Sequence, residues 1–445
     1  MSEKFYAKFT ESPKTKKNSK KNSKPEKKIS GDKGDRLSLH KSDKGDRLTR
    51  DALQFKLLNS QFDEKSVPED AKKILEDFDN LIQSVRPLNS KQLLQLPDNI
   101  RNLSHQLTDQ RSERRLGYMN ENVQLSAYVR YYTWWNLVRL TRLFSNLNKN
   151  CFPEKDCICL DNGSGPLTVV ISLWLARPEL RKLNLTWYCL DVSSNSMALG
   201  EDIYLSVAAK LLGNTWKIIR VKGPFGTYIK EKADFITCAN MLNELDQASD
   251  MPPEFQTKKY FDQFNSYASK DAKFLLIEPG VPKASRTLSL LRERFIKAGK
   301  FVWAPCPHSF DCPMNGFKAY TGSSNKWCNF AFSTESAPEK LQKLSERSKL
   351  PKERATLSYL SVIPENFRKT QEAENELLLR IVSDSFRVPG ANQGFYACSK
   401  LGLTLVKLTS DKKIVSGDLL KVELKTSAEN LQTDQKSGAK IIVIG

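Results

Sequence analysis

Apolar residues recur at three- and four-residue steps along residues 68–87, which is the spacing of one face of a helix. The face is made by Ala71, Ile74, Leu75, Phe78, Leu81, Ile82 and Val85. Pro68 suits the first helical position and Pro87 ends the pattern, because proline is tolerated at a helix start but disrupts a helix interior. The pattern therefore predicts a helix with one buried side.

Helical spacing continues over residues 90–108, where a pair of helices is expected around Pro97, and over residues 121–148. The last stretch interleaves aromatic rings with arginines, namely Tyr128, Tyr131, Tyr132, Trp134 and Trp135 with Arg130, Arg139 and Arg142. Such a stripe can stack on nucleotides, but it more often packs in a core beside the stems of its arginines. We expect residues 51–150 to form a helical region with these rings in its core.

From residue 156 the pattern changes, and short apolar runs alternate with helical segments. The predicted strands are CICLD, LTWYCLD, WKIIRV, DFITCA and KFLLIE, and a helix is expected next, over residues 283–299. This alternation is typical of a parallel, doubly wound sheet. The predicted fold class is α/β, with a Rossmann-like domain over residues 151–300.

The loop after the first predicted strand reads DNGSGP and contains candidate cofactor-binding residues, which are Asp161, Gly163, Gly165 and Pro166. Glycine allows the backbone to approach a ligand closely, and a helix that opens at Pro166 would present free N–H groups to it. Asp191 ends the next predicted strand, where a carboxylate can bind ribose hydroxyls at the carboxyl edge of the sheet.

Two cofactors suit this loop, a dinucleotide and S-adenosylmethionine. The dinucleotide fingerprint requires a third glycine, and Thr168 stands in its place. An acidic residue that opens the loop, as Asp161 does, is typical of class I methyltransferases, so we expect S-adenosylmethionine, with a Rossmann core that has lost its ligand as the alternative. Asn240, in the segment ANMLNELD, is a further candidate contact. That segment lacks the Asn/Asp-Pro-Pro-aromatic turn that commonly holds a substrate amine, so no catalytic residue is assigned.

Three of the nine cysteines, Cys306, Cys312 and Cys328, lie close together in a loop-like segment, and proline follows the first two. Thiolates on irregular backbone suit a soft metal, and the candidates for a fourth ligand are His308 and Cys398. Zinc accepts either ligand, whereas an iron–sulfur cluster usually takes four thiolates. The alternative is that these residues are buried free thiols, because cysteine packs as a small apolar side chain.

We expect the cysteine-rich metal-binding segment to cover residues 301–335, followed over residues 336–445 by a helical connector and a small β-rich module. Residues 338–348 and 365–380 have a charged helical pattern. From Arg380 onward, the runs RIVSDSF, FYACSK, LTLVKL and LLKVEL predict short strands. Cys398 lies in one of these runs. A metal that joins Cys398 to the earlier cysteines would therefore fasten the module to the doubly wound sheet.

The chain is strongly basic, with 70 Lys and Arg against 51 Asp and Glu and a formal net charge of +19. Residues 1–50 hold 16 basic and 7 acidic residues, so nearly half of the excess lies in this tail, which we expect to be disordered. A basic excess favours a polyanionic partner, for which RNA is the leading candidate. The alternative is a solvated tail that only aids solubility.

The sequence contains no run of 18 apolar residues, so no membrane association is expected. Its start has no apolar core of a secretory signal, and Glu3 and Glu11 among many lysines do not suit a mitochondrial presequence. An odd number of cysteines in a large non-secreted chain suggests a reducing compartment. We expect a bacterial cytoplasm, with the mitochondrial matrix as the alternative.

Several motifs between Leu96 and Gly417 form a family pattern: LPDNIRNLSHQLT, AYVRYYTWWN, DNGSGP, LDVSSNSM, IEPG, CPHSFDCP, WCNF, LSYL and GFYACSKLG. Together they resemble the methyltransferase-like assembly factors of the small ribosomal subunit in mitochondria, which have bacterial relatives. The resemblance implies a class I methyltransferase fold that binds S-adenosylmethionine. It also implies binding to small-subunit ribosomal RNA in the pre-small-subunit particle. A [4Fe–4S] cluster is implied as well, with four ligands, which are Cys306, Cys312, Cys328 and Cys398. Zinc is the alternative metal, and His308 becomes a neighbour of the cluster.

The leading hypothesis is an assembly factor that binds ribosomal RNA, is a monomer off the ribosome and uses its cluster structurally. An active S-adenosylmethionine-dependent rRNA methyltransferase is the alternative, and an RNA-binding sensor of iron or redox state is a second one. The sequence leaves open whether the protein is an enzyme.

Overall fold

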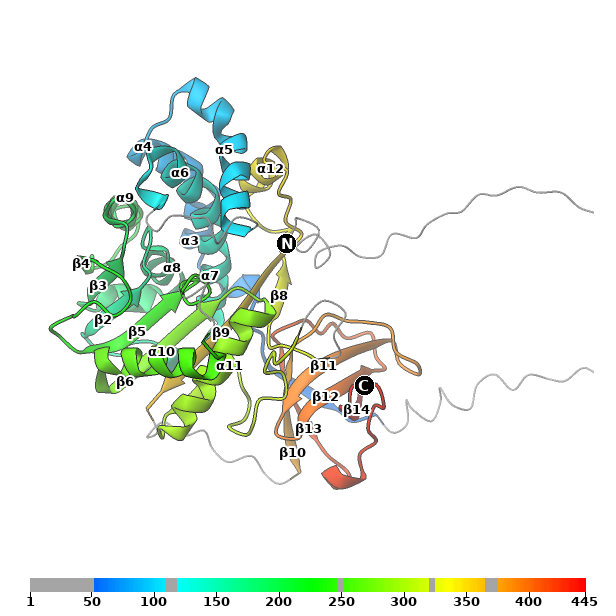
Figure 1. The fold of residues 1–445 in the computed structure, drawn as a ribbon. Coiled ribbons are helices and arrows are strands. Elements are labelled where there is room, and N and C mark those ends of the chain that lie inside the picture. Colours follow the sequence, from blue (N-terminus) through cyan, green and yellow to red (C-terminus); the bar gives the residue numbers. More distant parts are fainter. Residues whose placement is uncertain (1–51, 109–117, 246–250, 320–324, 365–374) are drawn as a thin grey trace, which may run out of the picture.

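The protein forms two β-sheets, and helices cover both faces of the larger one (Figure 1). The computed structural model describes residues 52–108, 118–245, 251–319, 325–364 and 375–445. The basic tail predicted over residues 1–50 lies outside the described residues. Among the helices that are described, none combines the length and the apolar character needed to cross a membrane.

The N-terminal region is mainly helical, with α3 (Glu69–Glu76), α4 (Phe78–Val85), α5 (Ser90–Thr108), α6 (Asn122–Ala127) and α7 (Trp134–Asn146). The apolar face predicted over residues 68–87 is buried, but the helix is divided at Asp77, whose φ of −99° and ψ of 12° leave the helical range. The expected pair of helices around Pro97 is wrong, because α5 continues through this buried proline.

The aromatic stretch between α6 and α7 includes a π-helical turn, Tyr128–Thr133. Tyr131 and Trp134 are buried, and the indole of Trp134 donates a hydrogen bond to the carbonyl oxygen of Leu75 at 2.8 Å. Arg130 donates to the side chain of Gln83 at 2.7 Å. The prediction that these rings pack in a core is therefore confirmed for Tyr131 and Trp134.

The larger sheet has the strand order β4-β3-β2-β5-β6-β9-β7, with β8 paired to β9. The strands are β2 (Ile158–Asn162), β3 (Thr186–Asp191), β4 (Lys217–Lys222), β5 (Ala233–Ala239), β6 (Ala268–Glu278), β7 (Phe301–Ala304), β8 (Phe330–Ser333) and β9 (Arg354–Ile363). The five neighbouring strands β4, β3, β2, β5 and β6 are parallel to one another. Strand β9 is antiparallel to β6 and to β7. The α/β fold is confirmed, and the sheet extends beyond the predicted range of 151–300.

Side chains that alternate along the strands enter two separate cores on the two faces of this sheet. Cys159 and Trp187 pack with the helices on one face, which are α7, α8 (Thr168–Ala176) and α9 (Ser194–Ala208). Leu160 and Ile236 pack on the other face with α10 (Pro253–Tyr267) and α11 (Pro282–Lys297). The chain reverses its direction of winding between β2 and β5, and the carboxyl edge at such a point is where α/β sheets bind ligands.

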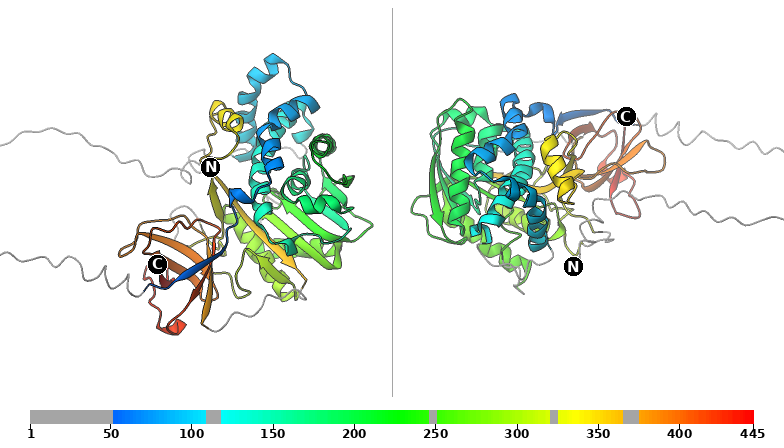
Figure 2. Two further views of the ribbon diagram at one scale, coloured as in Figure 1. Left: turned by 180° about the vertical axis from the view of Figure 1, so that it is seen from behind. Right: turned by 90° about the horizontal axis from the view of Figure 1, so that it is seen from above.

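The smaller sheet contains strands from the region where a β-rich module was expected, but one of its strands comes from the other end of the chain (Figure 2). Its strands, in spatial order, are β1 (Phe55–Asn59), β13 (Leu419–Glu423), β10 (Glu376–Ile381), β11 (Gln393–Ser399), β12 (Gly402–Leu408) and β14 (Lys440–Ile444). β1 was missed by the helical prediction over residues 51–150, because its partner β13 is distant in the sequence.

The connector predicted between the sheets is only partly helical. The helix expected over residues 338–348 is present as α12 (Glu339–Arg347). The helix expected over residues 365–380 is wrong where the structure has β10, and its first part, 365–374, lies outside the described residues. These residues form a strand in spite of their helical pattern, because their apolar side chains pair with β11 and β13.

Candidate functional site

The glycine loop after β2 is tied to the end of β3. The backbone N–H groups of Gly163 and Ser164 donate to the carbonyl oxygen of Leu190 at 2.8 and 3.1 Å. Gly163 and Gly165 have positive φ angles of 69° and 48°, which glycine adopts without strain. Helix α8 begins at Thr168 after Leu167, so the expected helix start at Pro166 is displaced by two residues.

Asp191, predicted to bind ribose, already accepts backbone hydrogen bonds with both of its oxygen atoms. Oδ2 accepts from the N–H of Gly165 at 2.9 Å, and Oδ1 accepts from the N–H of Ser193 at 2.8 Å. The side chain is buried, and burial raises the pKa of its carboxyl. Asp191 therefore joins the glycine loop to the start of α9, whatever ligand the loop holds.

Asp161 is buried at the start of the same loop. Its Oδ1 accepts from the hydroxyl of Thr237 at 2.6 Å, while Oδ2 has no hydrogen-bond partner among the described residues. Burial raises the pKa of this carboxyl to about 7. The unpartnered oxygen is an acceptor that a ligand with an N–H or O–H donor could use, because a buried polar atom is costly to leave unpaired.

The space beside the two glycines is occupied by methionine side chains of the protein itself. A Cβ atom at Gly163 would lie 2.7 Å from Cβ and Cγ of Met241, and one at Gly165 would lie 3.8 Å from Cε of Met119. Close approach at this loop was predicted, but the approaching group in the structure is a side chain from a distant segment. Nothing in the sequence pattern identified either methionine.

Pro166 packs against α9 instead of opening a helix. A Cβ atom at Gly200 would lie 2.4 Å from the carbonyl carbon of Pro166, so this helix can approach the loop only because residue 200 is glycine. The predicted residues Asp161, Gly163, Gly165, Pro166 and Asp191 are thus brought together at the carboxyl ends of β2 and β3.

Asn240 follows β5 in a left-handed conformation, with φ of 58°. Its side-chain oxygen accepts from Nη2 of Arg139 on α7 at 2.9 Å. Glu278, at the end of β6, accepts from the N–H of Leu242 at 2.8 Å and from the N–H and side-chain amide of Asn243 at 3.1 and 3.0 Å. The loop after β5 is thus held from two sides.

Glu278 is completely buried, and burial raises the pKa of its carboxyl to about 7. The sequence analysis assigned no role to Glu278 and placed Arg139 only among the arginines of the aromatic stripe. The motif IEPG placed Glu278 at a strand end beside the other candidate residues, which was a usable signal. Arg139 lies on a helix more than a hundred residues earlier, so its contact with Asn240 could come only from the tertiary structure.

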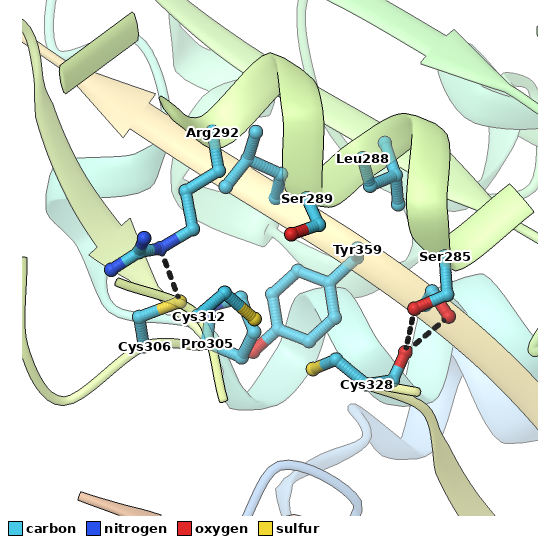
Figure 3. A pocket seen from close by; sticks show the side chains of 11 residues that line it. Ser285, Leu288, Ser289, Arg292, Pro305, Cys306, Cys312, Cys328 and Tyr359 are labelled. Carbon is cyan, nitrogen blue, oxygen red and sulfur yellow. Dashed lines mark hydrogen bonds between the residues drawn. The ribbon is translucent and has the colours of Figure 1, made fainter. Parts of the chain in front are cut away.

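The cysteine segment lines a cavity of about 30 Å³ beneath α11 (Figure 3). Cys306 follows β7, Cys328 precedes β8, and Cys312 lies between them. The carbonyl oxygen of Cys328 accepts from the hydroxyls of Ser285 and Ser358 at 2.8 and 2.7 Å. Two elements of the larger sheet's domain, α11 and β9, thereby hold the segment in place.

Cys398, on β11 of the smaller sheet, approaches the same place. Its sulfur lies 3.1 Å from Nε2 of His308. Burial raises the pKa of the Cys398 thiol, and the neighbouring thiols of Cys306 and Cys312 raise it further. The same two causes, burial first, raise the pKa of Cys328. The structure therefore gathers the four predicted cysteines and His308 in one region.

Among the described residues, no group of three or more His, Cys, Asp or Glu side chains is arranged so that it could hold a metal ion. The assignment of Cys306, Cys312, Cys328 and Cys398 as ligands therefore stays a prediction.

The strand order of the larger sheet, with antiparallel β9 inserted between β6 and β7, fits the class I methyltransferase fold. Residues 140–393 match the family described as mitochondrial small ribosomal subunit Rsm22. Because this match covers more than half of the sequence, the chain belongs to that family. A search of curated proteins gave no match.

Three solved structures illustrate the similarity to known folds. A methyltransferase from Pyrococcus furiosus is 15% identical over 35% of this chain and 70% of its own, with a TM-score of 0.26. A SAM-dependent methyltransferase from Geobacter sulfurreducens in complex with S-adenosyl-L-homocysteine is 13% identical over 52% and 90%, with a TM-score of 0.28. YjhP from E. coli is 14% identical over 60% and 99%, with a TM-score of 0.29. With TM-scores this low, the fold class follows from the strand order alone.

Proposed function

We propose that the protein is an assembly factor of the small ribosomal subunit and binds ribosomal RNA in the pre-small-subunit particle. Family membership over residues 140–393 carries this proposal. The net charge of +19 supports a polyanionic partner. The family description names mitochondria, so we place the protein in the mitochondrial matrix instead of the bacterial cytoplasm expected from its N-terminus. Off the ribosome we expect a monomer.

S-adenosylmethionine is the cofactor that we assign to the glycine loop. Asp161, Gly163, Gly165, Pro166, Asp191 and Asn240 would hold it, and the unpartnered Oδ2 of Asp161 supports a ligand at this position. When bound, the cofactor supplies a cationic sulfonium and a transferable methyl group. The protein's part is to fix the loop, through the hydrogen bonds of Leu190 and Asp191 to its N–H groups.

The loop after β5 supports a binding role without methyl transfer. In enzymes that methylate exocyclic amines, this loop holds the substrate nitrogen. Here the side-chain oxygen of Asn240 is used by Arg139, and the N–H groups of Leu242 and Asn243 are used by Glu278. The side chain of Met241 packs against the backbone of Gly163. These polar groups therefore serve the fold of the protein.

We further propose that Cys306, Cys312, Cys328 and Cys398 hold a [4Fe–4S] cluster, with zinc as the alternative. The chemistry of the donors supports this proposal, because four largely buried thiols lie in one region of the structure and soft metals prefer such ligands. Cys398 belongs to the smaller sheet and the other three to the larger domain. A metal centre here would supply a cross-link between the two, which stabilises their docking.

Binding to a small-subunit rRNA fragment at increasing salt tests the RNA-binding role of the full chain. Counterion release predicts that the logarithm of the association constant falls linearly and steeply with the logarithm of salt concentration. Co-sedimentation with small-subunit precursors, and their accumulation when the protein is depleted, test the assembly role. A binding constant that is insensitive to salt, together with absence from the precursor fractions, would overturn the proposal.

An active rRNA methyltransferase is the second candidate function, and the unpartnered Asp161 oxygen beside the glycine loop favours it. Mapping of modified nucleotides in small-subunit rRNA, with and without the gene, decides between the two. A modification that disappears with the gene and returns with the wild-type protein, but not with Asp161→Ala, would establish methylation. An unchanged pattern would remove this candidate.

A further inference from the structure

Arg292 is a buried cation on the wall of the cysteine cavity (Figure 3). It lies on the face of α11 that also carries Ser285 and Ser289, all of which line the cavity. Its Nε donates to the sulfur of Cys306 at 3.1 Å. Figure 3 shows the guanidinium reaching directly toward that sulfur atom.

The same guanidinium fixes the loop that follows Cys306. Its Nη2 donates to the carbonyl oxygens of His308 and Phe310 at 2.9 and 2.7 Å. His308 is the residue whose Nε2 contacts the sulfur of Cys398. One arginine therefore holds a cysteine and the backbone of the loop that meets the second sheet.

The hydrogen bonds of the Arg292 guanidinium to the described residues go to one sulfur and two carbonyl oxygens, none of which is a carboxylate, although a buried charge needs a counter-charge. The groups that act to raise the pKa of Arg292 against the effect of its burial are the thiols of Cys306, Cys312 and Cys398. Cysteine binds metal as the thiolate, so a loaded metal centre would supply the negative charge that this buried cation lacks.

A second buried arginine approaches Cys306 from the smaller sheet. Arg380, on β10, donates to the carbonyl oxygen of Pro305 at 3.0 Å, and Pro305 directly precedes Cys306. It also donates to the carbonyl oxygen of Gly417 at 2.6 Å. Burial lowers the pKa of the Arg380 guanidinium, and the nearby side chains of Tyr359, Cys306 and Asp418 act in the opposite direction.

We propose that Arg292 is the positioning and charge-compensating residue of the thiolate centre, and that its N–H···S bond to Cys306 tunes the retention and the reduction potential of the bound metal. This inference rests on the proposed metal centre. A cation and an N–H donor at a ligand sulfur stabilise added negative charge, so they make a cluster easier to reduce. They also hold the ligand in position, as residues around first-shell ligands do.

The test uses full-length protein purified without oxygen as wild type, Arg292→Met, Arg292→Lys and Arg294→Met. Arg294→Met is the matched control, because Arg294 lies on the same helix but donates to the exposed carbonyl oxygen of Glu254. The measurements are iron, sulfide and zinc per chain, visible absorption, the reduction midpoint by spectroelectrochemistry, and the half-time of metal loss to a chelator. Circular dichroism checks that each variant is folded.

We expect Arg292→Met to lose metal about 10- to 100-fold faster than wild type and to have a lower midpoint. Arg292→Lys keeps the charge but not the planar donor fork, so its values should be intermediate. Arg294→Met should match wild type. If Arg292→Met does not fold, the test rests on Arg292→Lys alone. A folded lysine variant with the metal-loss rate and midpoint of wild type would overturn the inference. If the metal is zinc, the half-time of loss is the deciding value.

Two further outcomes separate this inference from the proposal beneath it. A wild-type protein that contains metal, together with unchanged loss rate and midpoint in folded Arg292→Met, overturns the role of Arg292 and leaves the metal centre standing. A wild-type protein with neither iron nor zinc overturns the metal centre, and with it the role assigned to Arg292.

Discussion

Nε2 of His308 lies 3.1 Å from the sulfur of Cys398, although ninety residues separate them in the chain. His308 belongs to the loop after β7 of the larger sheet, and Cys398 lies on β11 of the smaller one. Arg380 makes a second link nearby, from β10 to the backbone of Pro305. The cysteine region is therefore a junction at which the two sheets are joined, and changes there should weaken the docking of one sheet on the other.

If the proposed cluster is present, Cys398→Ser should remove most of its iron with the visible absorption and lower the melting temperature, because the change deletes the one thiol supplied by the smaller sheet. Metal analysis, absorption spectroscopy and calorimetry measure these effects. Cys157→Ser is the control, since Cys157 is half-buried at the start of β2, away from the cysteine cavity. Unchanged iron content in Cys398→Ser would refute its assignment as a ligand.

Gly163→Ala should destabilise the protein even without any ligand. Alanine at a positive φ costs about 1–2 kcal/mol, and overpacking against Met241 adds about 1–3 kcal/mol. Gly402→Ala is the matched control, because Gly402 also has a positive φ, of 87°, but no heavy atom lies within 4 Å of the position of an added Cβ. Urea unfolding compares the two variants, and equal losses would contradict the contact between Met241 and the loop.

Asp191→Ala should lower the free energy of unfolding by about 1–3 kcal/mol in the absence of cofactor, because the N–H groups of Gly165 and Ser193 lose their acceptor. A carboxylate that served only to bind ribose would leave the stability of the ligand-free protein unchanged. Asp202→Ala, at an exposed position of α9, serves as the control. Denaturant unfolding of both variants distinguishes the two roles.

The buried carboxyl of Glu278 should make stability depend on pH. Its pKa is raised by burial from 4.5 to about 7, so the unfolded state ionises at a lower pH than the folded state. The contribution to stability is fully present below pH 4.5 and is lost as the pH rises through about 7, by on the order of 3 kcal/mol. Glu278→Gln should flatten this part of the profile.

Urea unfolding between pH 5 and pH 8 gives the slope for wild type, Glu278→Gln and the exposed control Glu346→Gln. Burial also raises the pKa of Asp161 to about 7. This carboxyl therefore adds a decrease of stability with pH of the same sign, and both Glu variants retain it. The difference between wild type and Glu278→Gln therefore isolates Glu278. Parallel profiles for these two proteins would show that this carboxyl does not titrate in the expected range.

The sequence by itself determined the class of the larger sheet, the place of its glycine loop, and the strand that carries Cys398. These features depend on the local spacing of apolar residues and on the backbone conformations that each residue type prefers. Both can be read from residues that are close together in the sequence. Alternating apolar positions such as Cys159 and Leu160 enter opposite cores because side chains alternate along a strand.

Only the tertiary structure decided which distant groups meet. In the structure, β1 pairs with β13 and the side chain of Met241 lies against Gly163. Arg139 donates a hydrogen bond to Asn240, and Arg292 donates one to the sulfur of Cys306. The local patterns predicted one helix across Asp77 and a helix up to residue 380, but the structure has a break at Asp77 and the strand β10. Such contacts depend on how whole elements pack, and the side chains that fill the space between them have no period in the sequence that could identify them.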